Sequence, residues 1–290
     1  MAGVPAPAGL EHPRRAGPAP AAAVNARALV GAVDVLLLTL DTLRFDVACA
    51  ALEAGRTPTL AGLLPGGRWE RRHSPGTFTW AAHQSFFAGF LPTPAAPGAH
   101  PRLFALAFPG SETTGPHTAV FDAPDIVHGF AAAGYHTVCV GGTGFFNLRT
   151  PLGRVLPGLF AERHWSPALG VTDPDSTRNQ VNLACRILAG LPLERRCFLF
   201  VNISAIHQPN RHYVPGKEQD DLESHAAALA CVDGQLPPLF EALRRRGGAL
   251  CVICSDHGTL YGEDGHVGHR YAHPDVWTVP YAQFLLGEPR

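Results

Sequence analysis

The sequence predicts an α/β domain in which a mainly parallel sheet is sandwiched between helices. Two observations support this. Short apolar runs of strand length alternate with longer stretches of helical character, as in α/β domains. The apolar runs are also continuous, without alternating polar residues, as is typical of strands buried on both faces. We therefore expect a sheet with helices on both sides and ligands at the carboxyl ends of its strands.

Five apolar runs are expected to form the strands. The first is VDVLLLTLD (33–41), which is rich in Val and Leu and ends on a carboxylate. The others, in chain order, are HTVCVGG (136–142), CFLFVNIS (197–204), ALCVICSD (249–256) and PYAQFLLG (280–287).

Four stretches between the strands are expected to be helical. They are TWAAHQSFFAGF (79–90), DAPDIVHGFAAAGY (122–135), TRNQVNLACRILAGL (177–191) and LESHAAALACVDGQLPPLFEALRRRG (222–247). Pro237 and Pro238 should kink or split the last one, because proline removes a helical N–H donor. The proline-rich stretches 90–104 and 164–176 are expected to be loops or lids.

The composition of the chain predicts its domain organisation and its cellular compartment. Residues 1–30 are rich in Ala and Pro and are expected to be a disordered leader, and residues 31–290 a single domain. The leader has Pro and Arg where a signal peptide needs an apolar core. No run reaches the ~18 apolar residues of a membrane span. The seven cysteines, an odd number mostly within apolar runs, favour a reducing compartment, so we expect a cytoplasmic protein without a membrane partner. A net charge of -1 offers no basic surface for nucleic acid.

Metal-ligand side chains stand at three strand ends. Asp41 closes the first strand, His207 lies just beyond the third, and Asp256 and His257 close the fourth. A single buried Asp is often only a structural cap. Carboxylates and imidazoles brought together at one buried edge need a compensating cation. The sequence therefore predicts a metal site at this edge.

Two further stretches carry candidate site residues. Thr79 stands at the start of a predicted helix, where free N–H groups and the helix dipole favour an anion, although Thr is also an ordinary N-cap. The stretch SDHGTLYGEDGHVGHRYAH (255–273) contains His257, His266, His269 and His273 in a glycine-rich loop.

These segments together resemble the alkaline phosphatase superfamily, particularly its sulfatase and phosphodiesterase branches. VDVLLLTLDTLRFD resembles the opening strand, with its metal-binding Asp and T-L-R-x-D run. SDHGTLYGEDGHVGH is similar to the S-D-H-G-x-x-x-G-E-x-G segment, and NISAIHQPNRHY to the H-x-P segment. In the family the nucleophile lies ten residues before the Gly of a G-x-x-P turn. GFLP (89–92) resembles that turn, so the same spacing identifies Thr79 as the nucleophile. The resemblance spans residues 33 to 287.

The resemblance implies a set of metal ligands. A first divalent metal, zinc or manganese, would be held by Asp41, Thr79, Asp256 and His257. A second, weaker site would use His207 and His269. His266 or His273 would complete the second site or protonate the leaving group, and His83 would take the place of a motif arginine. Zinc and manganese accept imidazole and carboxylate ligands and lower the pKa of a bound hydroxyl.

Departures from the family pattern narrow the expected activity. Sulfatases need Cys or Ser at the nucleophile position within C/S-x-P-x-R, whereas this chain has TWAAH (79–83). The sulfate-binding Lys of G-K-W-H is also missing from VGGTGFF (140–146). The carboxylate that supports a second metal is replaced by Ile203, which weakens that site.

We therefore expect a hydrolase of small-molecule phosphate mono- or diesters, or of phosphonate esters, acting through a covalent phospho-threonine intermediate. A phosphoryl transferase, a sulfatase and a non-catalytic metal-binding protein stay open as alternatives. The chain stops where larger relatives continue into another subdomain. Internal loops or another subunit would close the pocket, so a homo-oligomer is a further alternative.

Overall fold

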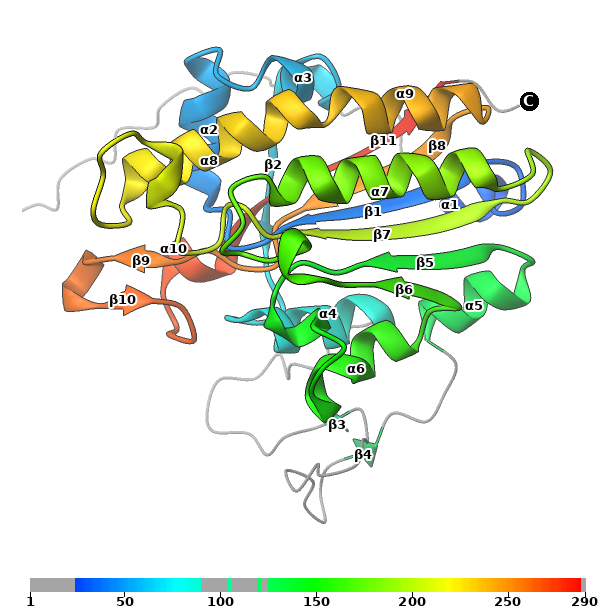
Figure 1. Cartoon of the computed structure of the whole chain (residues 1–290), viewed down its shortest axis with the longest axis horizontal. Coiled ribbons are helices and arrows are strands. Elements are labelled where there is room, and N and C mark those ends of the chain that lie inside the picture. The colour runs from blue at the N-terminus through cyan, green and yellow to red at the C-terminus, as the bar shows by residue number, and fades with distance from the viewer. Residues whose placement is uncertain (1–23, 90–103, 106–118, 121–124, 288–290) are drawn as a thin grey trace, which may run out of the picture.

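The computed structural model describes residues 24–89, 104–105, 119–120 and 125–287, which form a seven-stranded sheet between two layers of helices (Figure 1). The order of its strands is β2-β11-β8-β1-β7-β5-β6. The five strands from β8 to β6 are parallel, and β11 is antiparallel to both β8 and β2. The prediction of a mainly parallel sheet is confirmed.

The strands of the large sheet are β1 (Asp34–Leu40), β2 (Glu70–His73), β5 (His136–Val140), β6 (Glu162–His164), β7 (Cys197–Ile203), β8 (Ala249–Cys254) and β11 (Thr278–Leu286). Two short pairs stand apart from it: β3 (Phe104–Ala105) with β4 (Ala119–Val120), and β9 (Leu260–Tyr261) with β10 (Val267–Gly268). All five predicted strands are present, each within two residues of its expected ends.

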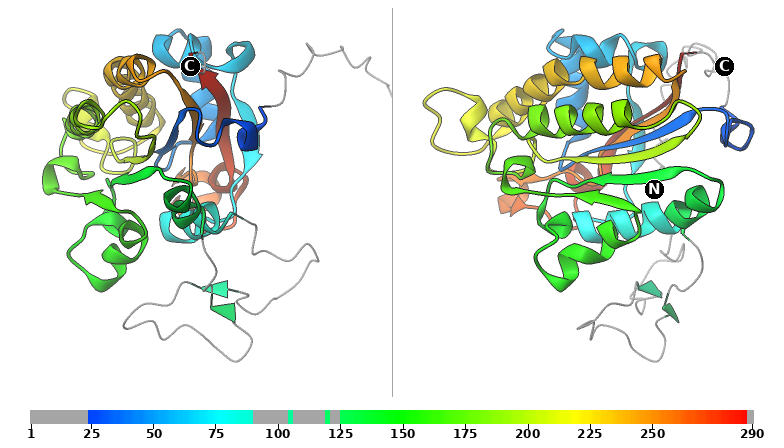
Figure 2. Two further views of the ribbon diagram at one scale, coloured as in Figure 1. Left: turned by 90° about the vertical axis from the view of Figure 1, so that its right-hand side faces the viewer. Right: turned by 45° about the vertical axis from the view of Figure 1, so that its right-hand side comes forward.

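Helices cover both faces of the sheet (Figure 2). One layer contains α2 (Phe45–Glu53), α3 (Pro58–Ala61), α7 (Ser176–Gly190), α8 (Leu222–Gln235) and α9 (Pro237–Arg245). The other contains α4 (Thr79–Ala88), α5 (Ile126–Ala132) and α6 (Pro151–Gly158); the short helices α1 (Ala26–Leu29) and α10 (Pro274–Trp277) complete the set. The predicted split of the last long helix is confirmed, because α8 ends at Gln235 and Pro237 opens α9.

The sequence analysis missed the edge strands β2 and β6. β2 has the sequence ERRH and all four residues are exposed, while β6 has the sequence ERH. Edge strands are commonly charged, since an apolar exposed edge would pair with other chains. Their polarity removes the apolar signal by which the inner strands were recognised. Helices α2 and α6 were also not anticipated.

The apolar core lies in two clusters, one on each side of the sheet. The first packs β1, β7 and β8 against α2, α7, α8 and α9. The second packs the opposite sheet face against α4, α5 and α6 and is rich in phenylalanine. At the amino end of β1, the buried Asp34 pairs with Arg246 at 2.7 Å and also accepts from the backbone N–H of Cys197. The charged groups at this end of the sheet therefore compensate one another.

The leader was predicted to span residues 1–30, and residues 1–23 of it lie outside the described residues. In its last part, Ala26–Leu29 form α1, and both Val24 and Leu29 pack against the second core cluster. Most of the loop expected at 90–104 also lies outside the described residues. Within the part of the chain that the structure describes, no helix has the length and apolarity needed to span a membrane.

Candidate metal centre

The carboxyl ends of β1 and β8 bring three predicted ligands together. β1 lies between β7 and β8, with Leu40 opposite Ile203 and Thr39 opposite Cys254. Asp41 follows β1 directly, whereas Asp256 and His257 follow β8 after one intervening residue. One ligand atom from each of these three side chains lies within 4.8 Å of the others. All three residues are fully buried.

The two carboxylates each have one oxygen without a partner. Oδ2 of Asp41 accepts from Asn202, and Oδ1 of Asp256 accepts from the N–H groups of Thr42 and His257. Oδ1 of Asp41 and Oδ2 of Asp256 are buried and accept no hydrogen bond. Such oxygens are costly to bury unless a cation compensates them. The donor set therefore fits a divalent metal bound by imidazole and carboxylate.

The ring of His257 is oriented by a hydrogen bond. Nδ1 lies 2.8 Å from the carbonyl oxygen of Gly258, which can only accept, so Nδ1 carries the proton. The lone pair is then on Nε2, which lies 3.5 Å from Oδ2 of Asp256 and 3.9 Å from Oδ1 of Asp41. A backbone carbonyl that fixes the tautomer is a common support for a metal-binding histidine. His257 is thus ready to act as a ligand.

Thr79 lies in the same group. Its hydroxyl oxygen is 3.4 Å from Oδ2 of Asp41 and 3.3 Å from Nε2 of His257, and the residue is 1% exposed. Phe78 is the N-cap of α4, so Thr79 is the first helical residue and does not act as the cap. The hydroxyl is consequently directed at the carboxylates and the imidazole.

Burial favours the neutral form of each of these groups. It raises the pKa of Asp41 to about 6, and the charge of Asp256 adds to this rise. Burial likewise raises the pKa of Asp256 to about 7, and it lowers the pKa of His257. In each case burial disfavours the charged form. A bound cation would reverse this for the carboxylates.

Asn202 supports the site and was not anticipated from the sequence. Its amide nitrogen donates to Oδ2 of Asp41 at 3.0 Å and to Thr39 at 3.2 Å, while its oxygen accepts from the N–H of Thr143 at 2.9 Å. The available signal was the amide inside the apolar run CFLFVNIS, because a buried polar residue in a central strand needs a partner.

His207 and His269 lie beside the metal group. The ring of His269 is 4.6 Å from that of His257 between centroids, and the ring of His207 is 5.5 Å from that of His269. Nδ1 of His269 is buried without a hydrogen-bond partner, and burial lowers the pKa of this residue to about 3. The structure therefore brings the two predicted second-site histidines together. They are not part of the group whose ligand atoms lie within 4.8 Å.

His83 is buried behind Thr79. Its Nδ1 donates to the carbonyl of Thr79 at 2.8 Å, and its Nε2 lies 3.2 Å from the hydroxyl of Thr39. Phenylalanine rings, including Phe146 and Phe200, contact the imidazole edge to face. Burial lowers the pKa of His83 to about 3. These contacts support the first turn of α4.

His266 and His273 are engaged elsewhere. His266 stacks on Tyr271, with ring centroids 4.0 Å apart. His273 is the N-cap of α10 and accepts from the N–H of Asp275 at 3.1 Å. Its other nitrogen contacts Asp264 at 3.2 Å. Neither residue belongs to the group of buried metal ligands.

The loop after β8 is held in place by close packing. The N–H of Gly258 donates to the carbonyl of Val276 at 2.7 Å, and a Cβ at Gly258 would lie 1.9 Å from the carbonyl oxygen of Asp275. Arg44, buried in the loop after β1, contacts Asp46, Glu263 and Asp275. It also donates to the carbonyl of Thr259 at 3.4 Å. The loops after β1 and β8 are therefore fixed to each other.

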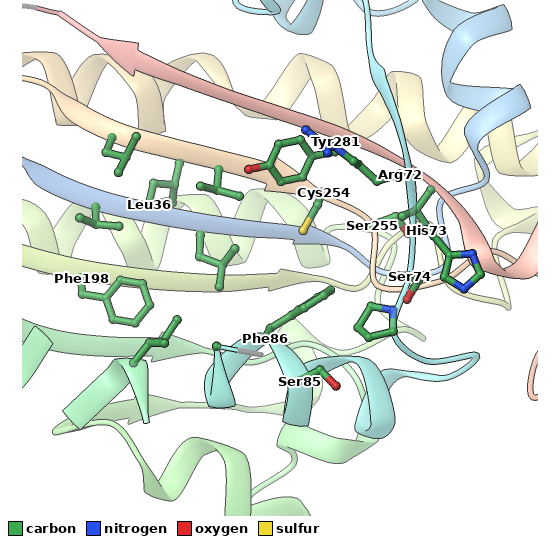
Figure 3. Close-up of a pocket in the computed structure, with 18 of the residues that line it drawn as sticks. Leu36, Arg72, His73, Ser74, Ser85, Phe86, Phe198, Cys254, Ser255 and Tyr281 are labelled. Carbon is green, nitrogen blue, oxygen red and sulfur yellow. The ribbon is translucent and has the colours of Figure 1, made fainter. Parts of the chain in front are cut away.

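A separate pocket of about 620 Å³ lies between the sheet and α4 (Figure 3). Leu36, Phe86 and Phe198 line its apolar part, and Arg72 and Tyr281 lie near the edge strand β2. None of the metal-ligand candidates lines it. The pocket is therefore not the cavity in which the chemistry at Asp41 and Thr79 would take place.

A scan against protein-family models and a search of the curated proteins found no match. Solved structures do match. The lipoteichoic acid synthase LtaP from Listeria monocytogenes is 13% identical with a TM-score of 0.60, and the alignment covers 91% of this chain and 67% of that one. The full-length lipooligosaccharide phosphoethanolamine transferase A (EptA) from Neisseria meningitidis is 14% identical with a TM-score of 0.57. This alignment covers 87% of our chain but only 47% of EptA, an integral membrane protein.

A protein in the alkaline phosphatase superfamily from Vibrio parahaemolyticus is also similar, with 15% identity, a TM-score of 0.54 and coverage of 89% of this chain and 61% of that one. At these identities the likeness concerns the fold. The described chain thus has the fold of the alkaline phosphatase superfamily, which confirms at the level of fold the resemblance that its motifs carry.

Proposed function

We propose that the protein is a metal-dependent hydrolase of phosphate mono- or diesters, or of phosphonate esters, with Thr79 as the nucleophile. One observation carries this proposal. The Thr79 hydroxyl lies 3.4 Å from Asp41 and 3.3 Å from His257, inside a buried group with two unpartnered carboxylate oxygens. A hydroxyl in such a group is placed for nucleophilic catalysis.

Asp41, Thr79, Asp256 and His257 would hold one zinc or manganese ion. When bound, the metal would lower the pKa of the Thr79 hydroxyl and neutralise charge that develops on a phosphoryl oxygen. The buried unpaired oxygens of Asp41 and Asp256 support this assignment. One of the similar structures, the periplasmic domain of EptC from Escherichia coli, is a complex with zinc.

The chain's own residues would organise the transfer. Oγ1 of Thr79 loses its proton and forms a bond to phosphorus as the bond from phosphorus to the leaving oxygen breaks, and the leaving oxygen takes up a proton. Water then cleaves the phospho-threonine, which releases the phosphoryl group and returns a hydrogen to Oγ1. Asp41 and Asn202 fix the surroundings of the hydroxyl, and His83 holds the carbonyl of Thr79. The first turn of α4 would direct its free N–H groups at the phosphoryl oxygens.

His207 and His269 are proposed as the second, weaker site. Their proximity to His257 supports this. Neither brings a carboxylate, and Ile203 stands where the resemblance would place one. We therefore expect one metal ion per chain at low metal concentration and a second only at higher concentration.

The test uses the purified full chain loaded with zinc or manganese. We expect hydrolysis of at least one probe among 4-nitrophenyl phosphate, bis(4-nitrophenyl) phosphate and a 4-nitrophenyl phosphonate ester. Thr79→Ala should abolish this activity at unchanged melting temperature. Thr137→Ala is the matched control, since Thr137 is a buried threonine in β5 whose hydroxyl accepts from Ala161. A metal-loaded wild type that is inactive on all three probes would refute the hydrolase.

Transfer to an acceptor is the second candidate. EptA is a phosphoethanolamine transferase and LtaP a lipoteichoic acid synthase, and both share this fold. A transferase would use the same Thr79 intermediate and pass the group to an alcohol or amine. Product analysis with and without an added alcohol acceptor separates the two activities. Aryl sulfate hydrolysis exceeding phosphate hydrolysis would instead favour a sulfatase, and metal binding without any turnover a non-catalytic role.

The compartment and the oligomeric state are proposals of the same kind. We propose a cytoplasmic location, which cell fractionation would test. Three of the similar structures are periplasmic domains, so a periplasmic signal is the competing result. A homo-oligomer that closes the site with a second copy would appear in size-exclusion chromatography with light scattering.

A further inference from the structure

Arg270 has an unusual backbone conformation next to the proposed nucleophile. Its φ is 71°, in the left-handed region that residues other than glycine rarely adopt. Its N–H donates to the carbonyl of Thr77 at 2.8 Å, two residues before Thr79. Strained conformations persist where the surrounding structure holds them, often at functional sites. The loop after β10 is therefore fastened to the segment that leads into α4.

The guanidinium of Arg270 lies over the ring of Phe78, 4.9 Å from its centroid. Phe78 is the N-cap of α4 and immediately precedes Thr79. The side chain is thus held beside the helix N-terminus that bears the nucleophile. Of the carboxylates that the structure describes, none forms an ion pair with Arg270, whereas the buried Arg44 and Arg246 are both paired. The N–H donors of its guanidinium are therefore free to bind an anion from solution.

Arg270 also directly follows His269, whose ring lies 4.6 Å from that of His257 between centroids. A cation at this position would act on any anion bound at Thr79.

Charge balance indicates why the site needs such a cation. A divalent metal at Asp41 and Asp256 is neutralised by the two carboxylates. A phosphate monoester then brings about two negative charges at neutral pH, and a diester brings one. His207 and His269 contribute imidazoles and no permanent charge. When only the first metal is bound, the remaining negative charge of a monoester has to be compensated by another group near Thr79.

We propose that Arg270 binds the non-bridging oxygens of the phosphoryl group at Thr79 and makes the site select phosphate monoesters over diesters. The inference rests on the proposed function and narrows its substrate class. A guanidinium offers two parallel donors to two oxygens of one phosphate. A diester has one anionic charge fewer and a second esterified oxygen, so it gains less from this contact.

The experiment measures binding separately from turnover. Isothermal titration of the zinc-loaded full chain with inorganic phosphate and with dimethyl phosphate gives the affinity for a dianion and for a monoanion. Arg270→Gln should weaken phosphate binding by roughly 10- to 100-fold, the worth of a charge-assisted hydrogen bond, and dimethyl phosphate binding by less. Arg270→Lys should recover part of the loss, and zinc content should stay at one ion per chain.

Two further variants control the result. Arg270→Gly removes the guanidinium while glycine adopts a φ of 71° freely, so it should keep the melting temperature and lose phosphate affinity. Arg72→Gln removes an arginine that stacks on Tyr281 at 5.1 Å on the edge strand, and should bind phosphate like the wild type.

Equal phosphate affinity in Arg270→Gln and wild type, or equal losses for the two ligands, would overturn the inference. A wild type that binds phosphate through Arg270 but hydrolyses no ester would refute the hydrolase and leave the anion-binding role of Arg270 standing. A zinc-loaded wild type that binds neither ligand would overturn both.

Discussion

Asn202 donates a hydrogen bond of 3.0 Å to Oδ2 of Asp41, which leaves Oδ1 of this carboxylate as the oxygen without a partner. The bond fixes the rotation of the carboxylate, so that the free oxygen is turned towards the group that contains His257. Asn202 is itself held by Thr143 and by Gln180, which donates to its carbonyl at 2.6 Å. The orientation of a first metal ligand is therefore set by a residue that would not touch the metal.

Asn202→Ala should weaken metal binding by roughly 10- to 100-fold, as the loss of groups that orient metal ligands commonly does. Competition with a chromogenic chelator measures the affinity. Asn179→Ala is the control, because the amide of Asn179 donates at the surface to a loop carbonyl, that of Ala168, at 2.9 Å. Unchanged affinity in Asn202→Ala would show that Asp41 needs no support.

The metal-free protein should become more stable when Asp256 cannot ionise. Burial raises the pKa of Asp256 to about 7, above the 3.8 of an unperturbed carboxyl. Because the folded pKa is raised, the favourable contribution is complete below pH 3.8 and is lost as the pH rises through 7. In EDTA, the advantage of Asp256→Asn over the wild type should therefore grow from about pH 4 to about pH 7, and the variant should melt on the order of 5 °C higher at about pH 8.

The buried histidines with lowered pKa change the stability with pH in the opposite sense. They are present in both the wild type and Asp256→Asn, so their effect cancels when the two are compared. Adding zinc at the higher pH should reverse the order, since only the wild type keeps both carboxylates. Differential scanning fluorimetry across this pH range gives the curves. A metal-free wild type that melts above Asp256→Asn at the higher pH would contradict the prediction.

The sequence predicted those parts of the site that depend on the chain's own pattern. Asp41, Asp256 and His257 end apolar strands, and parallel strands must bring their carboxyl ends to one edge. Thr79 was predicted as the nucleophile from the spacing of a family motif. Asn202 and Arg270 were missed because their roles depend on which neighbour the fold brings to them. Arg270 is an exposed arginine in a loop, and only the contacts with Thr77 and Phe78 distinguish it from any other.

Gly258→Ala should disrupt the metal centre through a single methyl group. The added Cβ would lie 1.9 Å from the carbonyl oxygen of Asp275, which belongs to the backbone and cannot move alone. The segment carrying His257 must then shift, so we expect a lower melting temperature and at least about tenfold weaker zinc binding.

Gly234→Ala is the matched control for this substitution. Gly234 lies in α8, and no neighbouring atom lies within 4 Å of the position that an alanine Cβ would take. Alanine there should stabilise the protein by up to about 1 kcal/mol. Equal effects of the two substitutions on zinc affinity would contradict the explanation by steric contact.

Arg44 connects the loops on either side of the metal centre, and its loss should loosen both. The side chain is 4% exposed and contacts Asp46 at 2.7 Å, Asp275 at 3.1 Å and Glu263. Arg44→Gln would leave three carboxylates without their cation. Because they are partly exposed, we expect a loss on the order of 2–3 kcal/mol, less than for a fully buried pair. Urea denaturation of the metal-free chain measures it.

The same substitution should also weaken zinc binding, since Glu263 and Asp275 flank the loop that contains His269. Arg44→Lys should recover little, because an ammonium cannot bond several carboxylates in the fixed geometry of a guanidinium. Arg211→Gln is the control, because the side chain of Arg211 is 46% exposed and pairs with Asp220 at 3.8 Å, so its loss should change stability by less than about 0.5 kcal/mol. If Arg44→Gln lost stability but kept its zinc affinity, the network would hold the fold without positioning the ligands.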